Sequence, residues 1–387
     1  MEAVGIICEY NPFHAGHKKQ FAAIKSEYPH SGIVCLMSGN YVQRGAPAII
    51  DKSIRAEVAV RCGADLVLEL PITAALSSAE GFAGEGVRIL GSFCNRLCFG
   101  TESGDADALL ATARGLLSPA FPEYLRLELD KGVSFPVARQ QALRQMGLKQ
   151  DTLSCPNDIL ATEYCKAILS QKLSMKPMPI AREGSYHGTV ADTENPSATA
   201  VRNCMLSGKL WQDYVPDGAR ELFSCAPLHD LSHGEQAILC RLRTMTDEDY
   251  EQLPYGSEGL WRKLMHNART LPTLEEIITA TKSKRYTRTR LDRMILCAFL
   301  GITRQDIETP APYARVLALN DTGRVLLKTA RKAGQFPNAG EHVDMPYQML
   351  EHRANRLYSL FSVNGKELPY DEKTRRVFYL SGETEEK

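Results

Sequence analysis

The chain lacks the features that would place it in a membrane or draw it to nucleic acid by bulk charge. Its longest apolar runs have the length of a strand, far below the roughly 20 residues that a membrane-spanning helix needs. Lys and Arg total 46, as do Asp and Glu, so no net charge attracts the protein to RNA or to an acidic membrane. Any contact with nucleic acid must therefore come from local clusters of basic side chains.

Paired cysteines and a leader-like segment are also missing. The cysteines number 11, and none stand in a Cys-x-x-Cys pair, which is typical of reduced thiols and argues against a structural zinc site. Glu2 follows Met1 and Glu9 interrupts the first apolar run, so we expect no signal peptide. The sequence predicts a cytoplasmic protein with no metal-binding residues, no membrane association and no stable protein partner.

Short apolar runs alternate with helical patterns in the first half of the chain. With 387 residues, 44% of them hydrophobic, the chain has the size and composition of a globular protein of two domains. The alternation predicts an α/β fold with a Rossmann-like parallel sheet. We expect strands at 3–10, 32–37, 64–70, 96–99 and 176–181, and helices at 14–25, 52–62, 77–90, 104–147 with a break near 119–122, 157–170 and 197–206.

Helical patterns dominate after about residue 211. They predict a mainly helical C-terminal domain, and we place the domain boundary between residues 210 and 211, giving domains 1–210 and 211–387. The expected helices are 233–247, 258–269, 273–282, 287–300, 322–332 and 346–361, with one strand at 315–319.

The segment Gly5–His17 carries the clearest chemical signal. An apolar strand ends in a turn, and His14 and His17 bracket Gly16 where a helix should begin. A helix N-terminus at the carboxyl end of a parallel strand suits phosphate binding. Two imidazoles on one helix face could stabilise the charge that develops as pyrophosphate leaves a nucleoside triphosphate. A capping turn with surface histidines is the plain alternative, and the strand–turn–helix context favours the nucleotide.

The segment Pro196–Arg202 resembles a second phosphate-binding element that accompanies the His-x-Gly-His turn in the nucleotidylyl transferase superfamily. Ser197 or Thr199 can cap a helix there, and the helix N–H groups and Arg202 can reach the β- and γ-phosphates. An ordinary helix cap with a surface arginine is the alternative.

Several further blocks share a pattern with one known family. Together with Gly5–His17 they resemble the bacterial tRNA(Met) cytidine acetate ligase family, within the His-x-Gly-His nucleotidylyl transferase superfamily, over nearly the whole chain. Two departures are Cys8, where Val or Thr is expected, and Asp158, where a second Asn is usual. The blocks are Ser38–Ala48, Asp51–Lys52, Gly63–Pro71, Phe99–Ser103, Pro156–Ala161 and Lys284–Leu291.

The resemblance implies an ATP-dependent ligase with a nucleotidylyl transferase type of sheet. Acetate would attack the α-phosphate of ATP, presented with Mg²⁺, to give acetyl-adenylate and pyrophosphate. The N4 amine of the wobble cytidine in elongator tRNA(Met) would then take the acetyl group, giving N4-acetylcytidine and AMP. The domain 1–210 would bind ATP and carry the catalysis, and the domain 211–387 would bind the tRNA.

The resemblance also assigns residues, with His14 and His17 as the catalytic pair. The residues expected to contact ATP are Ile7, Cys8, Glu9, Tyr10, Asn11, Pro12, Phe13, His14, Gly16, His17, Gly100, Asn157, Arg182, Ser197, Thr199 and Arg202.

The segment 38–52 has neither strand nor helix period. It could be a solvated loop, or a substrate loop that acts as a lid or lines the acetate and phosphate pocket, with Gly39 and Gly45 allowing movement. The residues expected to serve this loop are Ser38, Asn40, Gln43 and Arg44.

A basic segment near residue 285 is the expected tRNA contact. Six of twelve residues are basic, and Tyr286 lies among them. The apolar stripe of the following helix predicts that the basic side chains mostly face outward, where they suit RNA phosphates. A solvated helix start is the alternative. The basic residues are Lys282, Lys284, Arg285, Arg288, Arg290 and Arg293, of which Lys284, Arg285, Arg288 and Arg290 are expected to bind tRNA.

Two other functions are compatible with parts of this pattern. An adenylyltransferase that joins ATP to a small phosphorylated acceptor would use the same histidines but would have no use for the basic segment. A non-catalytic, nucleotide-sensing RNA-binding protein would bind ATP without releasing pyrophosphate. The histidine pair argues against the second, because a sensor needs no leaving-group chemistry.

Overall fold

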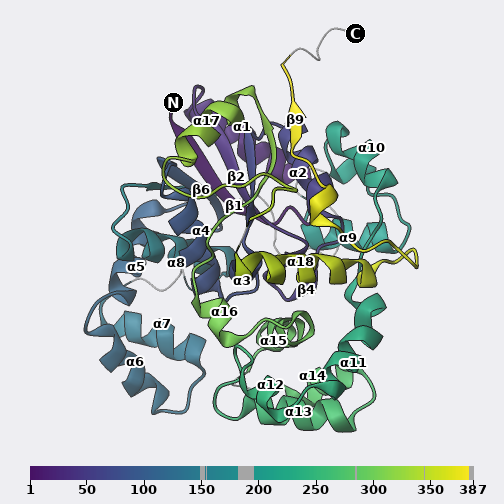
Figure 1. The fold of residues 1–387 in the computed structure, drawn as a ribbon. Helices are drawn as coiled ribbons and strands as arrows, with labels where there is room; N and C mark the ends of the chain where they lie inside the picture. Colours follow the sequence, from purple (N-terminus) through teal and green to yellow (C-terminus); the bar gives the residue numbers. More distant parts are fainter. Residues whose placement is uncertain (149–152, 154, 182–195, 284–285, 344, 383–387) are drawn as a thin grey trace.

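A seven-stranded sheet lies at the centre of the fold in the computed structural model, which describes residues 1–148, 153, 155–181, 196–283, 286–343 and 345–382 (Figure 1). The strand order is β7-β6-β1-β2-β5-β8-β9. The strands of this sheet are β1 (Ala3–Cys8), β2 (Gly32–Ser38), β5 (Leu66–Leu70), β6 (Arg96–Thr101), β7 (Lys176–Ala181), β8 (Val316–Asn320) and β9 (Phe378–Leu380).

The five strands from the first half of the chain run parallel, as predicted. The chain moves outward from β1 through β2 to β5 and then crosses back to β6 on the other side of β1. The strand order therefore reverses between β1 and β6, and ligands of such sheets bind at the carboxyl ends of the strands beside this reversal.

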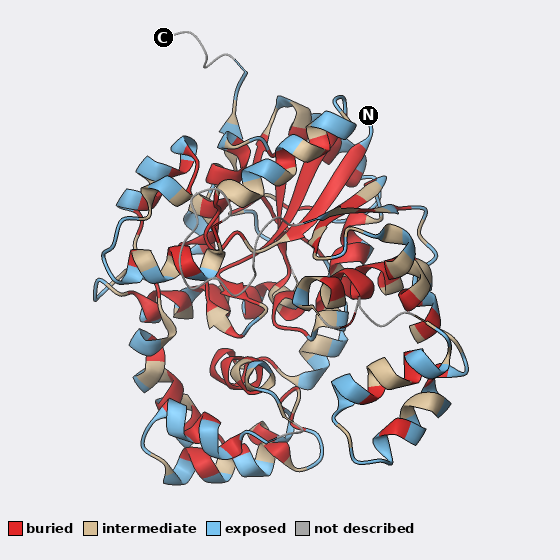
Figure 2. Ribbon diagram, turned by 180° about the vertical axis from the view of Figure 1, so that it is seen from behind, coloured by how far each residue is buried: buried red, intermediate tan, exposed pale blue. Residues whose placement is uncertain are grey.

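Both faces of the sheet are covered by helices, which is why β2 is buried along its whole length (Figure 2). Successive side chains of a strand point to opposite faces, so Ile7 and Val34 join one hydrophobic cluster and Ile6 and Ile33 the other. The helices over the first face are α4 (Ala79–Leu90), α5 (Ala106–Leu116), α8 (Pro156–Ser170) and α17 (Asp321–Ala330). The helices over the second face are α1 (Ala15–Glu27), α2 (Lys52–Arg61), α9 (Ala198–Leu206) and α10 (Asp217–Cys225).

A layer of helices lies on the carboxyl side of the sheet, with α15 at its centre and α18 crossing between it and the sheet (Figure 1). Its hydrophobic cluster includes Leu242, Leu264, Ile277 and Leu296. The helices of this layer are α11 (Glu235–Thr244), α12 (Asp247–Glu251), α13 (Leu260–Thr270), α14 (Leu274–Thr281), α15 (Arg288–Leu300), α16 (Arg304–Glu308) and α18 (Pro346–Tyr358).

Shorter elements complete the chain. The predicted break in the helix 104–147 separates α5 from α6 and α7, and a two-stranded hairpin interrupts the segment 38–52. These elements are β3 (Tyr41–Val42), β4 (Ala46–Pro47), α3 (Ile72–Ala75), α6 (Phe121–Leu129), α7 (Phe135–Gln145) and the 3₁₀ helices η2 (Gln212–Tyr214), η3 (Leu231–Gly234), η4 (Ser359–Phe361) and η5 (Glu372–Thr374).

The C-terminal part returns to the sheet. Strand β8 pairs antiparallel with β5, and β9 pairs with β8, so two strands that follow residue 211 complete the sheet that begins with β1. The division into 1–210 and 211–387 stays a prediction, and the sheet takes strands from both parts. All 11 cysteines are free thiols, and no helix within the described ranges is long and apolar enough to cross a membrane.

Candidate nucleotide-binding site

The two histidines of the first turn form a compact pair at the N-terminus of α1. His14 is the residue that caps the helix, and its Nδ1 accepts the N–H of Gly16 at 3.1 Å. The N–H of His14 in turn donates to Nδ1 of His17 at 3.1 Å. The rings stack, with centroids 3.7 Å apart. The prediction that both imidazoles share the start of a helix is therefore correct in its geometry.

These hydrogen bonds also set which ring nitrogen carries the proton. Because each Nδ1 accepts a backbone N–H, the neutral imidazoles hold their hydrogen on Nε2. Both Nε2–H groups are therefore donors at the helix terminus, where the partial positive charge of α1 favours an anion. The pair can thus donate to phosphate oxygens without first being protonated.

Helix α9 brings the second predicted element to the same turn. Ser197 caps α9 by accepting the N–H of Ala200 at 3.1 Å. Arg202 donates from Nη1 to the carbonyl oxygen of Asn11 at 2.6 Å and from Nη2 to Thr199 Oγ1 at 3.0 Å. A guanidinium from residue 202 therefore lies against the loop that ends at the histidine pair, and it adds positive charge there.

Strand β6 and helix α8 form the other wall of the site. Asn157 lies in the first turn of α8, and its Nδ2 donates to Glu102 Oε1 at 2.8 Å. Asp158 is buried, and its Oδ1 accepts the N–H groups of Glu102 and Ser103 at 2.9 and 3.3 Å. Asp158, which departs from the family pattern, is thus bound to backbone amides. Gly100 lies in β6, level with the end of β1.

The segment 38–52 is not a solvated loop. Ser38 and Asn40 are buried, and Asn40 Oδ1 accepts the N–H of Lys52 at 2.9 Å. Gln43 is partly buried, its N–H donates to Glu9 Oε1 at 2.8 Å, and Arg44 at the hairpin tip is exposed. Of the four residues expected to serve substrate, Gln43 is hydrogen-bonded directly to the first turn.

Gly39 and Gly45 pack closely against their neighbours. A Cβ at Gly39 would lie 2.2 Å from Glu69 Oε1, and one at Gly45 would lie 2.5 Å from the backbone nitrogen of Arg293. Gly45 also has a φ of +79°, which side chains other than glycine rarely adopt. Both glycines are therefore places of close packing, and the hairpin is fixed against α15.

Arg55 is a central residue of the site that the sequence did not reveal. It is fully buried, and its guanidinium donates to four carbonyl oxygens. Nη1 donates to Glu9 at 2.6 Å and to Ser38 at 3.1 Å, Nε donates to Ile50 at 2.7 Å, and Nη2 donates to Gly39. Arg55 thereby joins the carboxyl ends of β1 and β2. Burial lowers the pKa of this guanidinium from its ordinary value.

A buried cluster of charged groups ties the segment 38–52 to the C-terminal elements. Lys52 Nζ lies 2.7 Å from Glu69 Oε2 and 2.8 Å from Glu372 Oε2. Arg315 Nε lies 2.8 Å from Glu351 Oε2. Three carboxylates thus share two cations out of contact with solvent, an arrangement that favours keeping one carboxyl group protonated.

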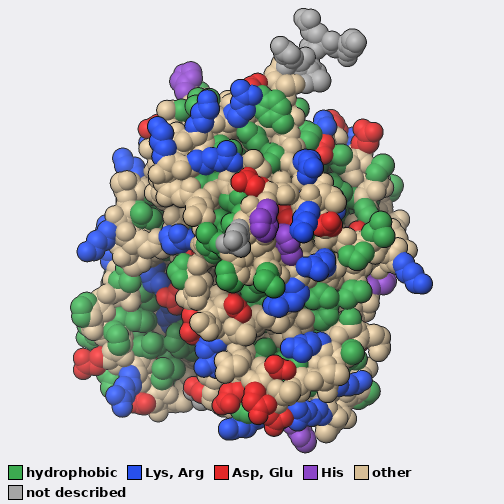
Figure 3. All heavy atoms as spheres, viewed as in Figure 1, with side chains coloured by type: hydrophobic (Ala, Val, Ile, Leu, Met, Phe, Trp, Pro, Cys, Tyr) green, Lys and Arg blue, Asp and Glu red, His purple; other side chains and the backbone are tan. Residues whose placement is uncertain are grey.

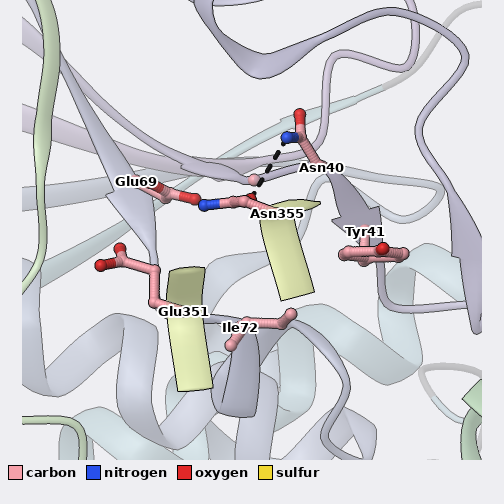
Figure 4. A pocket seen from close by; sticks show the side chains of 7 residues that line it. Asn40, Tyr41, Glu69, Ile72, Glu351 and Asn355 are labelled. Carbon is pink, nitrogen blue, oxygen red and sulfur yellow. Dashed lines mark hydrogen bonds between the residues drawn. The ribbon is translucent and has the colours of Figure 1, made fainter. Parts of the chain in front are cut away.

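A small cavity lies inside this cluster (Figure 4). Its volume is about 10 Å³, close to the smallest that holds one water molecule. Glu69 and Glu351 approach it from β5 and α18, and Asn40 donates to Asn355 Oδ1 at 3.2 Å beside it. The cavity is too small for a nucleotide or for acetate, so it belongs to the packing between the two parts of the chain.

The buried cluster should make stability depend on pH near neutrality. Burial raises the pKa of Glu69 to about 7, with Glu351 and Glu372 adding to the shift and Lys52 opposing it. Folding therefore favours the protonated form, and this stabilisation is lost as pH rises through about 7. We expect the free energy of unfolding to fall between about pH 4.5 and pH 7 more steeply in the wild type than in Glu69→Gln, because the unfolded carboxyl loses its proton near pH 4.5 and the folded one near pH 7. Urea denaturation at several pH values measures it. The surface variant Glu57→Gln should follow the wild type, and equal slopes in wild type and Glu69→Gln would contradict the assignment.

The basic side chains at the start of α15 make more contacts within the protein than the sequence predicted. Arg288 forms a two-pronged ion pair with Glu275, with N–O distances of 2.6 and 2.7 Å. Arg290 donates to the Tyr255 carbonyl at 2.7 Å. Arg293 is buried, so the expectation that it faces outward is wrong.

The face of the molecule seen in Figure 3 shows no single large patch of basic side chains. Lys and Arg side chains are dispersed there among other types, and acidic side chains gather at its lower edge over the helical layer. Arg182 of the ATP set, and Lys284 and Arg285 of the tRNA set, lie outside the described residues.

The parallel sheet with its strand reversal beside β1, and the histidine pair that opens α1 at that point, define a nucleotidyl transferase. The comparison with known families agrees with the site, since the model described as HIGH Nucleotidyl Transferase matches residues 1–372. The tRNA(Met) cytidine acetate ligase of Clostridium novyi is 37% identical over 361 residues, covering 87% of this chain and 89% of that protein. The enzyme of the same name from Clostridium acetobutylicum is 34% identical over 406 residues, covering 98% of this chain and 100% of that protein.

Solved structures show the same relation. The apo crystal structure of Thermotoga maritima TmcAL covers 98% of this chain and 100% of its own, with 29% identity and a TM-score of 0.89. The TmcAL structure bound with alpha-thio ATP has a TM-score of 0.85 at the same identity and coverage. The chain belongs to the tRNA(Met) cytidine acetate ligase family of HIGH nucleotidyl transferases.

Proposed function

We propose that this protein is an ATP-dependent ligase that acetylates N4 of the wobble cytidine in elongator tRNA(Met). It activates acetate as acetyl-adenylate with release of pyrophosphate, and it then transfers the acetyl group to the cytidine with release of AMP. The observation that carries the first step is the stacked pair of His14 and His17, with both Nε2–H donors at the start of α1. The family relation carries the choice of acetate and tRNA.

The residues of the site divide between the parts of ATP. The histidines, the N–H groups of α1 and Arg202 suit the phosphates, because all of them supply positive charge or donors on one turn. Gly100 and Asn157, at the ends of β6 and the start of α8, suit the adenosine. In this assignment the pyrophosphate leaves on the side of α9. Arg202 of α9 already lies there, because it donates a hydrogen bond to the carbonyl oxygen of Asn11.

Mg²⁺ would enter with the nucleotide. Within the described residues no group of three or more His, Cys, Asp or Glu side chains is arranged to hold a metal ion. Phosphate oxygens and water commonly supply most Mg²⁺ ligands in such sites. We therefore propose that the ion binds as part of the ATP complex. On the protein, His14, His17 and Arg202 would offset the negative charge of the phosphates. The location that suits ATP and tRNA as substrates is the cytoplasm.

The helices α11–α15 and the basic segment at the start of α15 are proposed to hold the tRNA. The ion pair of Arg288 with Glu275 is exposed on both sides, and exposed pairs contribute little stability. A phosphate group of the RNA can therefore replace Glu275 as the partner of Arg288 at small cost in free energy. The Arg288 guanidinium would then pair with Glu275 in the free protein and with a phosphate in the tRNA complex.

Neutralising Arg285, Arg288 and Arg290 together should raise the Kd for tRNA several-fold and flatten its dependence on salt, because fewer counterions are released on binding. Filter binding at several salt concentrations measures both quantities. A matched control replaces Arg114, Arg126 and Arg144, three exposed arginines on α5, α6 and α7. Equal weakening by both triple variants would show that total charge, and not the α15 segment, determines binding.

The proposed function is tested by incubating the protein with ATP, labelled acetate and purified tRNA(Met). Nuclease digestion and mass spectrometry should find the label in the wobble cytidine. Pyrophosphate release that needs a small phosphorylated acceptor, with no label in any nucleoside, would instead support an adenylyltransferase.

A further inference from the structure

Glu9 directly follows β1 and is among the residues expected to contact ATP, yet the activation step proposed above gives its carboxylate no role. Its carbonyl oxygen accepts from Arg55 Nη1 at 2.6 Å, and its Oε1 accepts the N–H of Gln43 at 2.8 Å. The backbone and the carboxylate of Glu9 are thus each held by one hydrogen bond. A negative charge there cannot assist the phosphates directly, because like charges repel.

The neighbours of Glu9 place it toward the helical layer. Gln43 belongs to the β3–β4 hairpin, and its carbonyl oxygen accepts from Arg293 Nη1 on α15 at 3.4 Å. The Gln43 side chain donates to the Ser77 carbonyl just before α4 at 3.2 Å. The turn that holds the histidines therefore has Arg202 of α9 against Asn11 and the hairpin against Glu9, and α15 in turn contacts the hairpin.

One oxygen of the carboxylate is committed and the other is not. Oε1 holds Gln43, whereas Oε2 makes no hydrogen bond to the residues that the structure describes. Glu9 is only partly buried. A carboxylate held by one oxygen at the end of the first strand is well placed to accept a proton with the other.

The second half of the proposed reaction releases a proton that needs an acceptor. When the cytidine amine attacks the acetyl carbonyl, a C–N bond forms and the C–O bond to the adenylate breaks. The electron pair of that bond leaves with the phosphate of AMP, and the attacking nitrogen must lose one hydrogen as H⁺. The exocyclic amine of cytosine is a weak nucleophile, so removing this proton as the bond forms speeds the step.

We propose that Glu9 is the general base of acetyl transfer, taking the proton from the N4 amine through Oε2 while Gln43 holds Oε1. This role rests on the proposed function. It gives the hairpin a defined task, since Gln43 orients the base and Arg293 and Gly45 fix the hairpin on α15.

The test separates activation from transfer in the variant Glu9→Gln. The amide oxygen of glutamine can still accept the Gln43 N–H, so the variant removes the base and keeps the hairpin contact. Hydroxylamine needs no base to attack an acyl-adenylate, and it converts acetyl-adenylate to acetohydroxamate. We expect hydroxamate formation to fall by less than about tenfold and acetyl transfer to tRNA(Met) by about 100-fold or more. Glu57→Gln, on the surface of α2, should match the wild type in both assays.

The pH dependence adds a readout that a merely structural role would not change. In single turnovers the transfer rate of the wild type should rise on the acid side of its profile, and this rise should be absent in Glu9→Gln. Equal losses in both assays, or wild-type transfer in the variant, would overturn the proposal. If the wild type makes no acetohydroxamate from acetate and ATP, the proposed function itself fails, which is a different result.

Discussion

The variant His17→Ala should form acetyl-adenylate at least tenfold more slowly than the wild type, and a loss of about 100-fold is expected if His17 donates to the leaving pyrophosphate. The physical reason is the lost Nε2–H donor at the terminus of α1, where charge develops on the bridging oxygen. The measurement is acetate-dependent pyrophosphate release at saturating ATP. Binding of tRNA should remain nearly unchanged, because we assign the tRNA contacts to the basic segment at the start of α15 and not to the turn that holds His17.

Loss of His17 also removes a local contact, so stability must be checked alongside activity. Its Nδ1 accepts the His14 N–H, and losing such a capping contact costs about 1 kcal/mol. A matched control is His30→Ala, an exposed histidine that precedes the amino end of β2, whereas His17 follows the carboxyl end of β1. Pyrophosphate release at the wild-type rate in a folded His17→Ala protein would remove the catalytic role.

The variant Arg55→Met should lose about 4 kcal/mol or more of its free energy of unfolding, because four carbonyl oxygens lose a charged donor inside the protein. Glu9, Ser38, Gly39 and Ile50 would each be left with an unpaired carbonyl at the carboxyl edge of the sheet. Activity should fall as well, since the ends of β1 and β2 carry the site. Urea denaturation gives the first quantity and pyrophosphate release the second.

Two control variants test whether this loss of stability is specific to the hydrogen bonds of Arg55. Arg55→Lys keeps the charge but cannot reach all four carbonyls, so its loss should lie between wild type and Arg55→Met. Arg61→Met, on the same helix but exposed and paired with Glu57, should cost less than about 1 kcal/mol. If Arg55→Met is as stable as Arg61→Met, the four hydrogen bonds do not hold the strand ends together.

Features that depend on neighbours in sequence were predictable here. The His14 and His17 pair, the Ser197 cap and the parallel order of the first strands all follow from short-range rules of strand ends and helix starts. A capping residue binds N–H groups two or three positions away, so its geometry is written in a few consecutive residues. The approach of Arg202 to the first turn was expected from the resemblance to the nucleotidylyl transferase superfamily.

Features that depend on distant partners were not predictable from one sequence. Lys52 and Arg55 look like ordinary polar positions of an amphipathic helix, yet both are buried. Their partners include Glu372 and the ends of two strands. The close packing of Gly39 and Gly45 was missed for the same reason, because their close neighbours are Glu69 and Arg293.

The sequence by itself determined the family of this protein, through a histidine turn whose hydrogen bonds are local and whose pattern is distinctive. The tertiary structure alone decided how that turn is held and what surrounds it. Strands β8 and β9 from the end of the chain complete the sheet, and a buried charge cluster joins Lys52 to Glu372. The hairpin places Glu9 beside Gln43. Such pairings between residues far apart in sequence depend on packing and on desolvation of charge, which no local pattern encodes.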